Sequence, residues 1–463
     1  MKTSDALVLF GATGDLAYKK IFPALHSMVR HGQLDVPVIG VARSGWDVER
    51  LKKRARRSIE EHGGGVEAQA FDKLASLLGY IDGDYRERDT FQRLRKSLGN
   101  SQRPLHYLAI PPSMFPTVVE HLGDAGCADA ARVVVEKPFG RDLASAVSLN
   151  KTLHKIFDED DIFRIDHYIG KEPVQNLMYF RFANSFLEPI WNRNYVASIQ
   201  ITMAEKFGVE GRGKFYEETG AVRDVVQNHL LQVAAHLAME PPIGEGGEAI
   251  RDEKVKVFRA MRPMLGHTLV RGQFSGYRDE EGVAADSQVE TYAAMRLHLD
   301  SWRWQGVPIF IRAGKRLAVT ATEVLVTLRR PPHNIFDEPL PDQANYFRFR
   351  LGPKQVAIAA GARTKEPGEK MKGRETELFV CSEGADEMDA YERLIGDAME
   401  GDPTLFARQD GVEAAWRIVE PILNRKSPVE VYKPGSWGPE AAEKLTAEFG
   451  GWHNPKRAQS RCG

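Results

Sequence analysis

A chain of 463 residues is too long to fold around one ordinary hydrophobic core, so two or three domains are expected. Its composition, with 42% hydrophobic and 27% charged residues, is typical of a soluble globular protein. The net charge of −1 excludes a general basic field for nucleic acid or a membrane surface, so any anion site must come from local clusters. The apolar run near the start is too short for a membrane span or a signal peptide, which predicts a cytoplasmic protein.

Short apolar runs alternate with amphipathic stretches in the first third of the chain. The apolar runs cover 7–10, 38–42, 105–110 and 132–135, and helical patterns cover 17–30 and 48–58. Such alternation indicates βαβ units around a parallel sheet. We therefore expect an α/β, Rossmann-type dinucleotide-binding domain over residues 1–165.

Beyond residue 164 the pattern changes to strands in which apolar and polar residues alternate. The clearest runs are VASIQITMAE, TYAAMRLHL, VPIFIRAG and EVLVTLRR. This alternation is typical of half-buried antiparallel strands. A long helix is expected over 220–239 and a surface loop over 241–253. The pattern predicts an α+β domain over residues 166–463, built on a large, mainly antiparallel sheet.

A glycine turn follows the first predicted strand. Gly11 permits a tight turn, Gly14 lets the backbone approach a pyrophosphate, and a helix begins near Asp15 and Leu16. The N–H groups and positive dipole end of that helix favour an anion. An ordinary strand–turn–helix is the alternative, but the position directly after the first strand favours a dinucleotide site.

The end of the second predicted strand bears on which dinucleotide binds. An NAD site uses an acidic residue there to hold the ribose 2′-hydroxyl. This chain has Arg43 and Ser44 instead, with no carboxylate placed to repel a 2′-phosphate. A surface arginine after a strand is common, but the missing acid favours NADP.

Two stretches carry candidate chemistry. In RIDHYIGKE, His167, Tyr168 and Lys171 can surround a phosphate at a helix start. In RDVVQNH, His229 is a candidate general base, and Asp166 can orient its ring.

Each of these residues also has a purely structural interpretation. His229 can be a hydrogen-bonded core histidine, Asp166 a helix cap, and Lys171 a solvated charge. His236 shares the helix face of His229, but two histidines without a third ligand do not predict a metal site.

Motifs along the whole chain resemble the glucose-6-phosphate dehydrogenase family. They are GATGDLA near the start, EKPFGRDL (136–143), RIDHYIGKE (164–172), GRGKFYEETGAVRDVVQNHLLQ (211–232), PIFIRAGK (308–315), and YERLIGDAM, WRIVEPIL and YKPGSWGPEA in the tail. The resemblance implies NADP-dependent oxidation of glucose 6-phosphate at C1, the first step of the oxidative pentose phosphate pathway. It also implies a Rossmann domain and an α+β domain that makes a homodimer or a dimer of dimers.

Carried over position by position, the resemblance implies a role for each motif residue. The base would be His229, with Asp166 as its partner. The substrate-binding residues would be His167, Tyr168, Lys171, Glu205, Asp224, Lys315 and Lys20. The cofactor-binding residues would be Gly11, Thr13, Gly14, Asp15, Leu16, Arg43, Ser44, Lys137 and Pro138, with Pro138 a cis proline.

The chain departs from the family pattern at one position. Five residues after the lysine of IRAGK the family has a second cation that contacts the substrate, whereas this chain has Thr320. Arg316 is near in sequence but is expected to point elsewhere. Two alternatives remain open: a dehydrogenase of another aldose or hexose phosphate, and a non-catalytic NADP-binding regulator.

Overall fold

The computed structural model divides into two compact units, each assembled from more than one stretch of chain. It describes residues 3–244, 246–333, 335–336, 344–353, 356–368, 371–382, 388–423 and 428–457. The first unit comprises Met1–Glu172, Pro242–Asp252 and Met388–Glu413. The second comprises Pro173–Pro241, Glu253–Glu387 and Ala414–Gly463.

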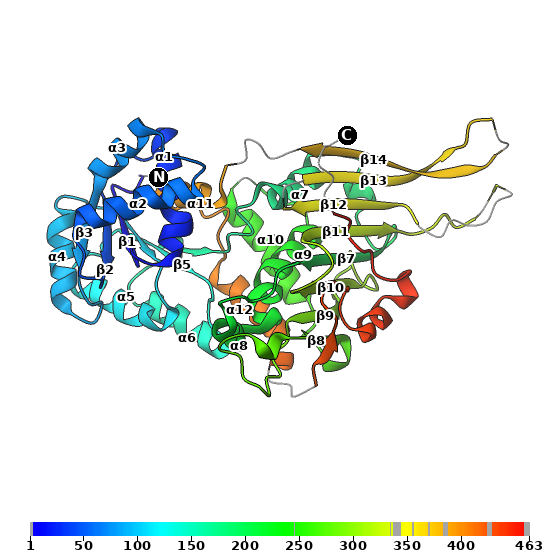
Figure 1. Cartoon of the computed structure of the whole chain (residues 1–463). Helices are drawn as coiled ribbons and strands as arrows, with labels where there is room; N and C mark the ends of the chain where they lie inside the picture. The colour runs from blue at the N-terminus through cyan, green and yellow to red at the C-terminus, as the bar shows by residue number, and fades with distance from the viewer. Residues whose placement is uncertain are drawn as a thin grey trace. The chain divides into compact units, whose positions relative to one another are not determined.

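The first unit contains a six-stranded parallel sheet (Figure 1). Its strands, in the spatial order β3-β2-β1-β4-β5-β6, are β3 (Leu78–Asp82), β2 (Val38–Ala42), β1 (Ala6–Phe10), β4 (Pro104–Leu108), β5 (Arg132–Glu136) and β6 (Ile162–Ile165). Strands β1, β2, β4 and β5 are buried along their whole length, which agrees with the mainly apolar residues in their sequences. The predicted dinucleotide-binding fold is confirmed.

Helices connect these strands and pack in two groups. The connecting helices are the π-helix η1 (Ala17–Ile21), α1 (Phe22–Arg30), α2 (Val48–His62), α3 (Ala68–Leu77), α4 (Arg88–Leu98), α5 (Phe115–Asp124) and α6 (Leu143–Leu153). Helix α1 packs with α2 and α3, whereas α5 packs with α4 and α6. Parallel strands joined by such crossovers form the doubly wound arrangement.

Two later segments return to the first unit. Helix α11 (Ala390–Glu400) places Leu394, Ile395 and Ala398 in the same buried cluster as Leu9 and Leu25. The first turns of α10 (Gly247–Ala260) and α12 (Gln409–Leu423) also belong to this unit. The structural division therefore differs from the single boundary expected at residue 165.

The prediction of a surface loop over 241–253 is wrong in its second half, because α10 begins at Gly247. A Cβ atom on Gly247 would lie 2.6 Å from the Cα of Thr404, so the glycine permits close packing of the helix start. One of the glycines that indicated a loop, Gly247, thus permits a close backbone contact.

The second unit contains a nine-stranded sheet of mixed direction (Figure 1). Its strands, in spatial order, are β14 (Gly373–Ser382), β13 (Val356–Lys365), β12 (Tyr346–Gly352), β11 (Ala321–Leu328), β7 (Val196–Ala204), β10 (Ile309–Gly314), β9 (Tyr292–Leu297), β8 (Leu269–Phe274) and β15 (Glu430–Tyr432). Only the β7–β10 and β8–β15 pairs are parallel. The expected large, mainly antiparallel sheet is confirmed.

The long helix expected over 220–239 consists of three consecutive pieces. They are the end of α8 (Gly213–Ala221), the π-helix η5 (Val222–Leu230) and α9 (Leu231–Ala238). Helix α7 (Glu172–Ala183) precedes them in the chain. Among the described residues, no helix has the length and apolar character that crossing a membrane requires.

Candidate active site

The glycine turn after β1 has the geometry that a pyrophosphate site requires. Gly11 has a φ of 81°, and a Cβ atom there would lie 2.1 Å from the carbonyl oxygen of Ala109. The Gly14 N–H donates to the Gly11 carbonyl at 2.9 Å, and helical residues begin with Asp15 and Leu16. The turn therefore accepts only glycine at position 11 and starts a helix at the carboxyl edge of the sheet, where N–H groups can bind an anion.

Tyr85 supports this turn, although the sequence patterns did not single it out. Its hydroxyl accepts a hydrogen bond from the Gly11 N–H at 2.8 Å and donates one to the Val41 carbonyl at 3.0 Å. The phenol thus joins the end of β1 to the end of β2. Tyr85 follows β3, so only the spatial order of the strands reveals the contact.

The Arg43–Ser44 turn at the end of β2 lies beside the glycine turn. The Ser44 hydroxyl is 2.8 Å from the hydroxyl of Thr13. The N–H groups of Ser44 and Gly45 both donate to the Asp82 carboxylate at 2.8 Å. These contacts bring Thr13 and Ser44 together, as expected for residues of one binding site.

The expectation that no carboxylate lies near this turn is wrong. The guanidinium of Arg43 is 2.6 Å from the carboxylate of Asp84, which follows β3. Because β3 is the neighbour of β2 in a parallel sheet, the ends of both strands meet at one edge. A carboxylate at the end of the neighbouring strand is not visible in the sequence of β2 itself.

Lys137 and Pro138 directly follow β5, at the same edge of the sheet, and the peptide bond between them is cis, as predicted. Asp15 forms an exposed ion pair with Lys19 at 3.0 Å. Lys20 is half exposed, and its ammonium lies 3.9 Å from the Asp389 carboxylate.

The residues after β6 form a compact polar turn in the first unit. Asp166 is 2% exposed, and its carboxylate accepts the Tyr168 N–H at 3.0 Å. The Lys171 ammonium lies 4.3 Å from the centre of the Tyr168 ring, and His167 stacks on Tyr391 with the ring centres 6.2 Å apart. The predicted phosphate-binding residues therefore lie within one short turn.

The remaining predicted residues lie in the second unit, at the ends of two paired strands and on η5. Glu205 follows β7 and Lys315 follows β10, and their charged groups are 2.5 Å apart. Asp224 and His229 lie on η5, where His229 is 3% exposed. A π-helical turn is rare and is often found at functional sites.

Tyr216 is a further residue of this group that the sequence patterns missed. Burial, followed by the charges of Asp224 and Glu205, raises the pKa of its hydroxyl well above the usual value. The Lys315 ammonium lies 5.6 Å from the centre of its ring. Tyr216 thus stays protonated beside Glu205, Asp224 and Lys315.

Thr320 and Arg316 have defined partners in the second unit. The Thr320 hydroxyl accepts the Lys206 N–H at 3.0 Å, which places position 320 beside the residue that follows Glu205. Arg316 pairs with Glu210 at 2.6 Å.

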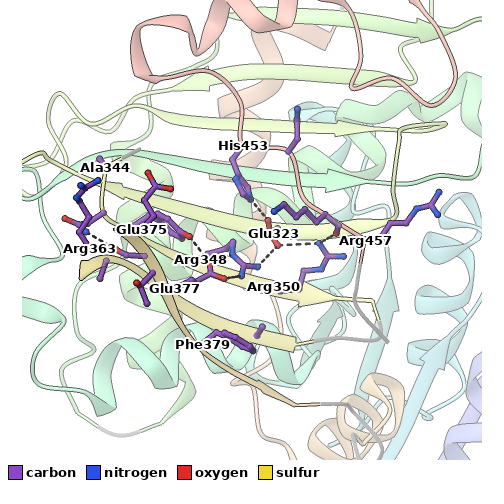
Figure 2. Close-up of a pocket in the computed structure, with 18 residues that line it drawn as sticks. Glu323, Ala344, Arg348, Arg350, Arg363, Glu375, Glu377, Phe379, His453 and Arg457 are labelled. Carbon is purple, nitrogen blue, oxygen red and sulfur yellow. Dashed lines mark hydrogen bonds and ion pairs between the residues drawn. The ribbon is translucent and has the colours of Figure 1, made fainter. Parts of the chain in front are cut away.

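A cavity of about 610 Å³ lies elsewhere in the second unit, on strands β11 to β14 (Figure 2). Glu323 is 3% exposed there and contacts His453 at 2.7 Å, Arg348 at 3.3 Å and Arg350 at 3.4 Å. Burial raises the pKa of Glu323, but His453 and the arginines lower it overall. None of the predicted site residues lines this cavity.

The fold and the strand-end residues of the first unit are those of a dinucleotide-dependent dehydrogenase. Two family models together cover nearly the whole chain. The model "Glucose-6-phosphate dehydrogenase, NAD binding domain" matches residues 8–176, and "Glucose-6-phosphate dehydrogenase, C-terminal domain" matches residues 178–453. The chain belongs to the glucose-6-phosphate dehydrogenase family.

Relatives and solved structures agree with this membership. Glucose-6-phosphate 1-dehydrogenase 1 of Mycobacterium tuberculosis is 45% identical over 98% of this chain and 97% of the relative. A crystal structure of glucose-6-phosphate 1-dehydrogenase from Mycobacterium avium matches with a TM-score of 0.93 and 44% identity, over 99% of this chain and 100% of that one. A glucose-6-phosphate dehydrogenase in complex with its substrate glucose 6-phosphate matches with a TM-score of 0.91 and 34% identity, over 98% and 100%.

Proposed function

We propose that this chain oxidises the C1 hydroxyl of glucose 6-phosphate to 6-phospho-D-glucono-1,5-lactone, with NADP+ as the hydride acceptor. The family and the full-length relatives establish glucose-6-phosphate dehydrogenase activity, which belongs to the pentose phosphate pathway. The observation that carries the proposal is the 45% identity, over 98% of the chain, to glucose-6-phosphate 1-dehydrogenase 1 of Mycobacterium tuberculosis.

In the proposed reaction, His229 is the general base. Breaking the C1–H bond as a hydride leaves a protonated carbonyl unless the hydroxyl proton also departs, and an imidazole can accept that proton near neutral pH. NADP+ supplies the hydride acceptor when it is bound. Asp166 orients the imidazole and stabilises its protonated form. Burial of both side chains supports these roles, because it strengthens electrostatic interactions.

The proposed substrate contacts form two groups, those to the phosphate and those to the sugar hydroxyls. His167, Tyr168 and Lys171 bind the phosphate, a role supported by their position in one short turn. The sugar hydroxyls contact the residues Glu205, Asp224, Lys315 and Lys20. The 2.5 Å pair of Lys315 and Glu205 supports this role, because it holds both charged groups at the ends of adjacent strands.

For the cofactor, the proposal assigns the pyrophosphate to the glycine turn, with Gly11, Thr13, Gly14, Asp15 and Leu16. Arg43 and Ser44 bind the 2′-phosphate of NADP. Lys137 and Pro138 lie where cofactor and substrate meet. The tight Gly11 turn and the contact of Thr13 with Ser44 support this set.

We also propose a homodimer or a dimer of dimers, as the family resemblance implies, and a cytoplasmic location. The name of one relative, glucose-6-phosphate 1-dehydrogenase 6 of Arabidopsis thaliana, includes the word cytoplasmic.

The test is the rate of NADPH formation, followed by absorbance, with glucose 6-phosphate, free glucose and other hexose phosphates. Glucose 6-phosphate is expected to give the highest kcat/KM. A higher value for another sugar phosphate would support the alternative substrate. Absence of NADPH formation with every sugar, despite NADP+ binding, would support the non-catalytic regulator.

A further inference from the structure

Two carboxylates from the neighbouring strand lie beside the residues proposed to bind the 2′-phosphate of NADP. Asp82 accepts the N–H groups of Ser44 and Gly45, and Asp84 pairs with the Arg43 guanidinium at 2.6 Å. The Asp82 charge is therefore already satisfied by backbone N–H groups. Asp84 is the carboxylate that contacts the proposed phosphate-binding cation.

Asp84 is held in place by contacts that do not involve Arg43. Its carboxylate also accepts the Arg86 N–H at 3.0 Å, and its carbonyl accepts the Thr90 hydroxyl at 2.9 Å. The preceding residue, Gly83, donates its N–H to the Ala42 carbonyl at 3.0 Å. The Asp84 side chain is therefore fixed at the end of β3 whether or not Arg43 is present.

The two partners differ in how exposed their side chains are. The Asp84 side chain is 19% exposed, whereas that of Arg43 is 73% exposed. The Arg86 N–H, and then the Arg43 charge, hold the pKa of the Asp84 carboxyl below its usual value, so the group is ionised at neutral pH. Arg43 is thus a solvent-exposed cation paired with an anion that other contacts hold in place.

We propose that Asp84 is a specificity-determining residue, which limits the preference for NADP over NAD by occupying the guanidinium of Arg43. The proposal rests on the assignment of Arg43 to the 2′-phosphate. NADP must share or displace the Asp84 contact and places a second anion beside the carboxylate. NAD has no 2′-phosphate, so it leaves the Arg43–Asp84 pair intact.

The variant Asp84→Asn tests this mechanism with little change in shape. An asparagine side chain can still accept the Arg86 N–H, so the turn at the end of β3 is retained. Removing the charge frees Arg43 for the phosphate and removes a repulsion. Both effects act on ligands with a 2′-phosphate and leave other ligands unchanged.

The probes are adenosine 2′,5′-bisphosphate and adenosine 5′-monophosphate, which differ only in the 2′-phosphate. Their dissociation constants are measured by calorimetry on the full-length protein. For Asp84→Asn, we expect the preference for the bisphosphate to rise roughly two- to fivefold, the scale of one ion pair near a protein surface. A matched control is Asp89→Asn on α4, which removes the same charge from an exposed pair with Arg93 and should leave the preference unchanged.

Two results would overturn the proposal. An unchanged or lowered preference for the bisphosphate in Asp84→Asn would mean that Asp84 positions Arg43 for the phosphate or has no effect on it. An equally large effect of Asp84→Asn in an Arg43→Ala background would mean that Asp84 does not act through Arg43. These binding measurements are independent of glucose 6-phosphate turnover, so failure of the proposed reaction would be seen separately.

Discussion

His229 lies on the π-helix η5, and its side chain is 3% exposed. If it is the general base, His229→Asn should lower kcat by about two to four orders of magnitude, because no group then accepts the C1 hydroxyl proton. The binding of glucose 6-phosphate should stay near that of the unmodified protein. Steady-state kinetics gives kcat, and calorimetry gives the dissociation constant of the sugar phosphate.

The folding of His229→Asn must be checked before its kcat is compared with that of the unmodified protein, since a buried histidine can also stabilise the helix. The variant should retain the unfolding midpoint of the unmodified protein within a few degrees. A folded variant with a kcat within about threefold of the original would remove His229 from the role of base.

Glu136 is a buried carboxyl group at the end of β5, and burial raises its pKa to about 7. The Glu136 carboxyl accepts a hydrogen bond from the Tyr107 hydroxyl at 2.5 Å. The side chains of Tyr391 and Lys137 also face this carboxyl, and the charge of Asp166 raises its pKa further. A carboxyl with a raised pKa stabilises the fold fully below its unfolded pKa, and this contribution is lost as the pH rises through the folded pKa. The window therefore runs from about pH 4 to about pH 7.

Glu136→Gln should remove this pH dependence, because the amide does not ionise. The free energy of unfolding of the unmodified protein should fall relative to that of the variant between about pH 4 and about pH 7, by up to about 3 kcal/mol. Urea unfolding of both proteins across that range measures the difference. A difference that stays constant with pH would mean that Glu136 titrates outside this window.

At the scale of elements, the sequence predicted four of the five strands of the parallel sheet that are buried along their whole length, and it missed β6. Strands β1, β2, β4 and β5 have apolar runs, and the glycine turn after β1 was found from its position. Strand β3 has a mixed burial pattern and no clear apolar run, so it was not predicted.

The missed strand β3 explains why Tyr85 and Asp84 were not predicted as site residues. Tyr85 and Asp84 both follow β3, and their contacts with Gly11 and Arg43 depend on β3 lying beside β2. The spacing of residues along a chain does not give the order of strands in a sheet. Candidate residues at the end of one strand were therefore predictable, whereas their neighbours on the adjacent strand were not.

The loop after β10 carries Thr320, where the family resemblance led us to expect a cation. Thr320→Lys should lower the KM for glucose 6-phosphate by about fivefold, roughly 1 kcal/mol, if the added cation contacts the substrate. The gain is modest because a partly solvated cation is screened and loses rotamer freedom. Oxidation of free glucose should be unaffected if the new contact is to the phosphate. Steady-state kinetics with both substrates measures the effect.

Thr320→Val is the matched control for this variant. It removes the hydroxyl that accepts the Lys206 N–H, without adding charge, and so isolates the loss of that bond. A raised KM in Thr320→Lys but not in Thr320→Val would indicate that another cation, such as Lys206, already contacts the phosphate and is repelled. An unchanged KM in both would mean that position 320 does not reach the substrate.

At the scale of the whole molecule, one arginine joins segments that are far apart in the sequence. Arg408 contacts Glu248 at 2.8 Å, Asp252 at 2.6 Å and Asp410 at 2.8 Å. Its side chain is 20% exposed, and Arg408→Ala leaves three partly exposed carboxylates close together without the cation that they share. Local opening of residues 246–252 and 388–413 should then become easier by up to about 1 kcal/mol, because the three carboxylates are 34–58% exposed and their ion pairs are screened by solvent.

Hydrogen–deuterium exchange measures this opening peptide by peptide. Peptides from these two segments should exchange faster in Arg408→Ala, whereas those from β8 to β10 should be unchanged. Arg262→Ala removes an exposed pair with Asp300 and should cause a smaller change. Equal acceleration in both variants would mean that Arg408 does not hold the segments in place.

The return of α11 to the first unit has a consequence for synthesis on the ribosome. A nascent chain that ends near residue 172 contains all six strands of the parallel sheet but not Leu394, Ile395 and Ala398, which complete its buried cluster. At ordinary translation rates, on the order of tens of seconds pass before α11 emerges. Throughout that interval the growing polypeptide exposes the apolar surface that α11 later covers, so it is a candidate client for chaperones that bind unfinished proteins.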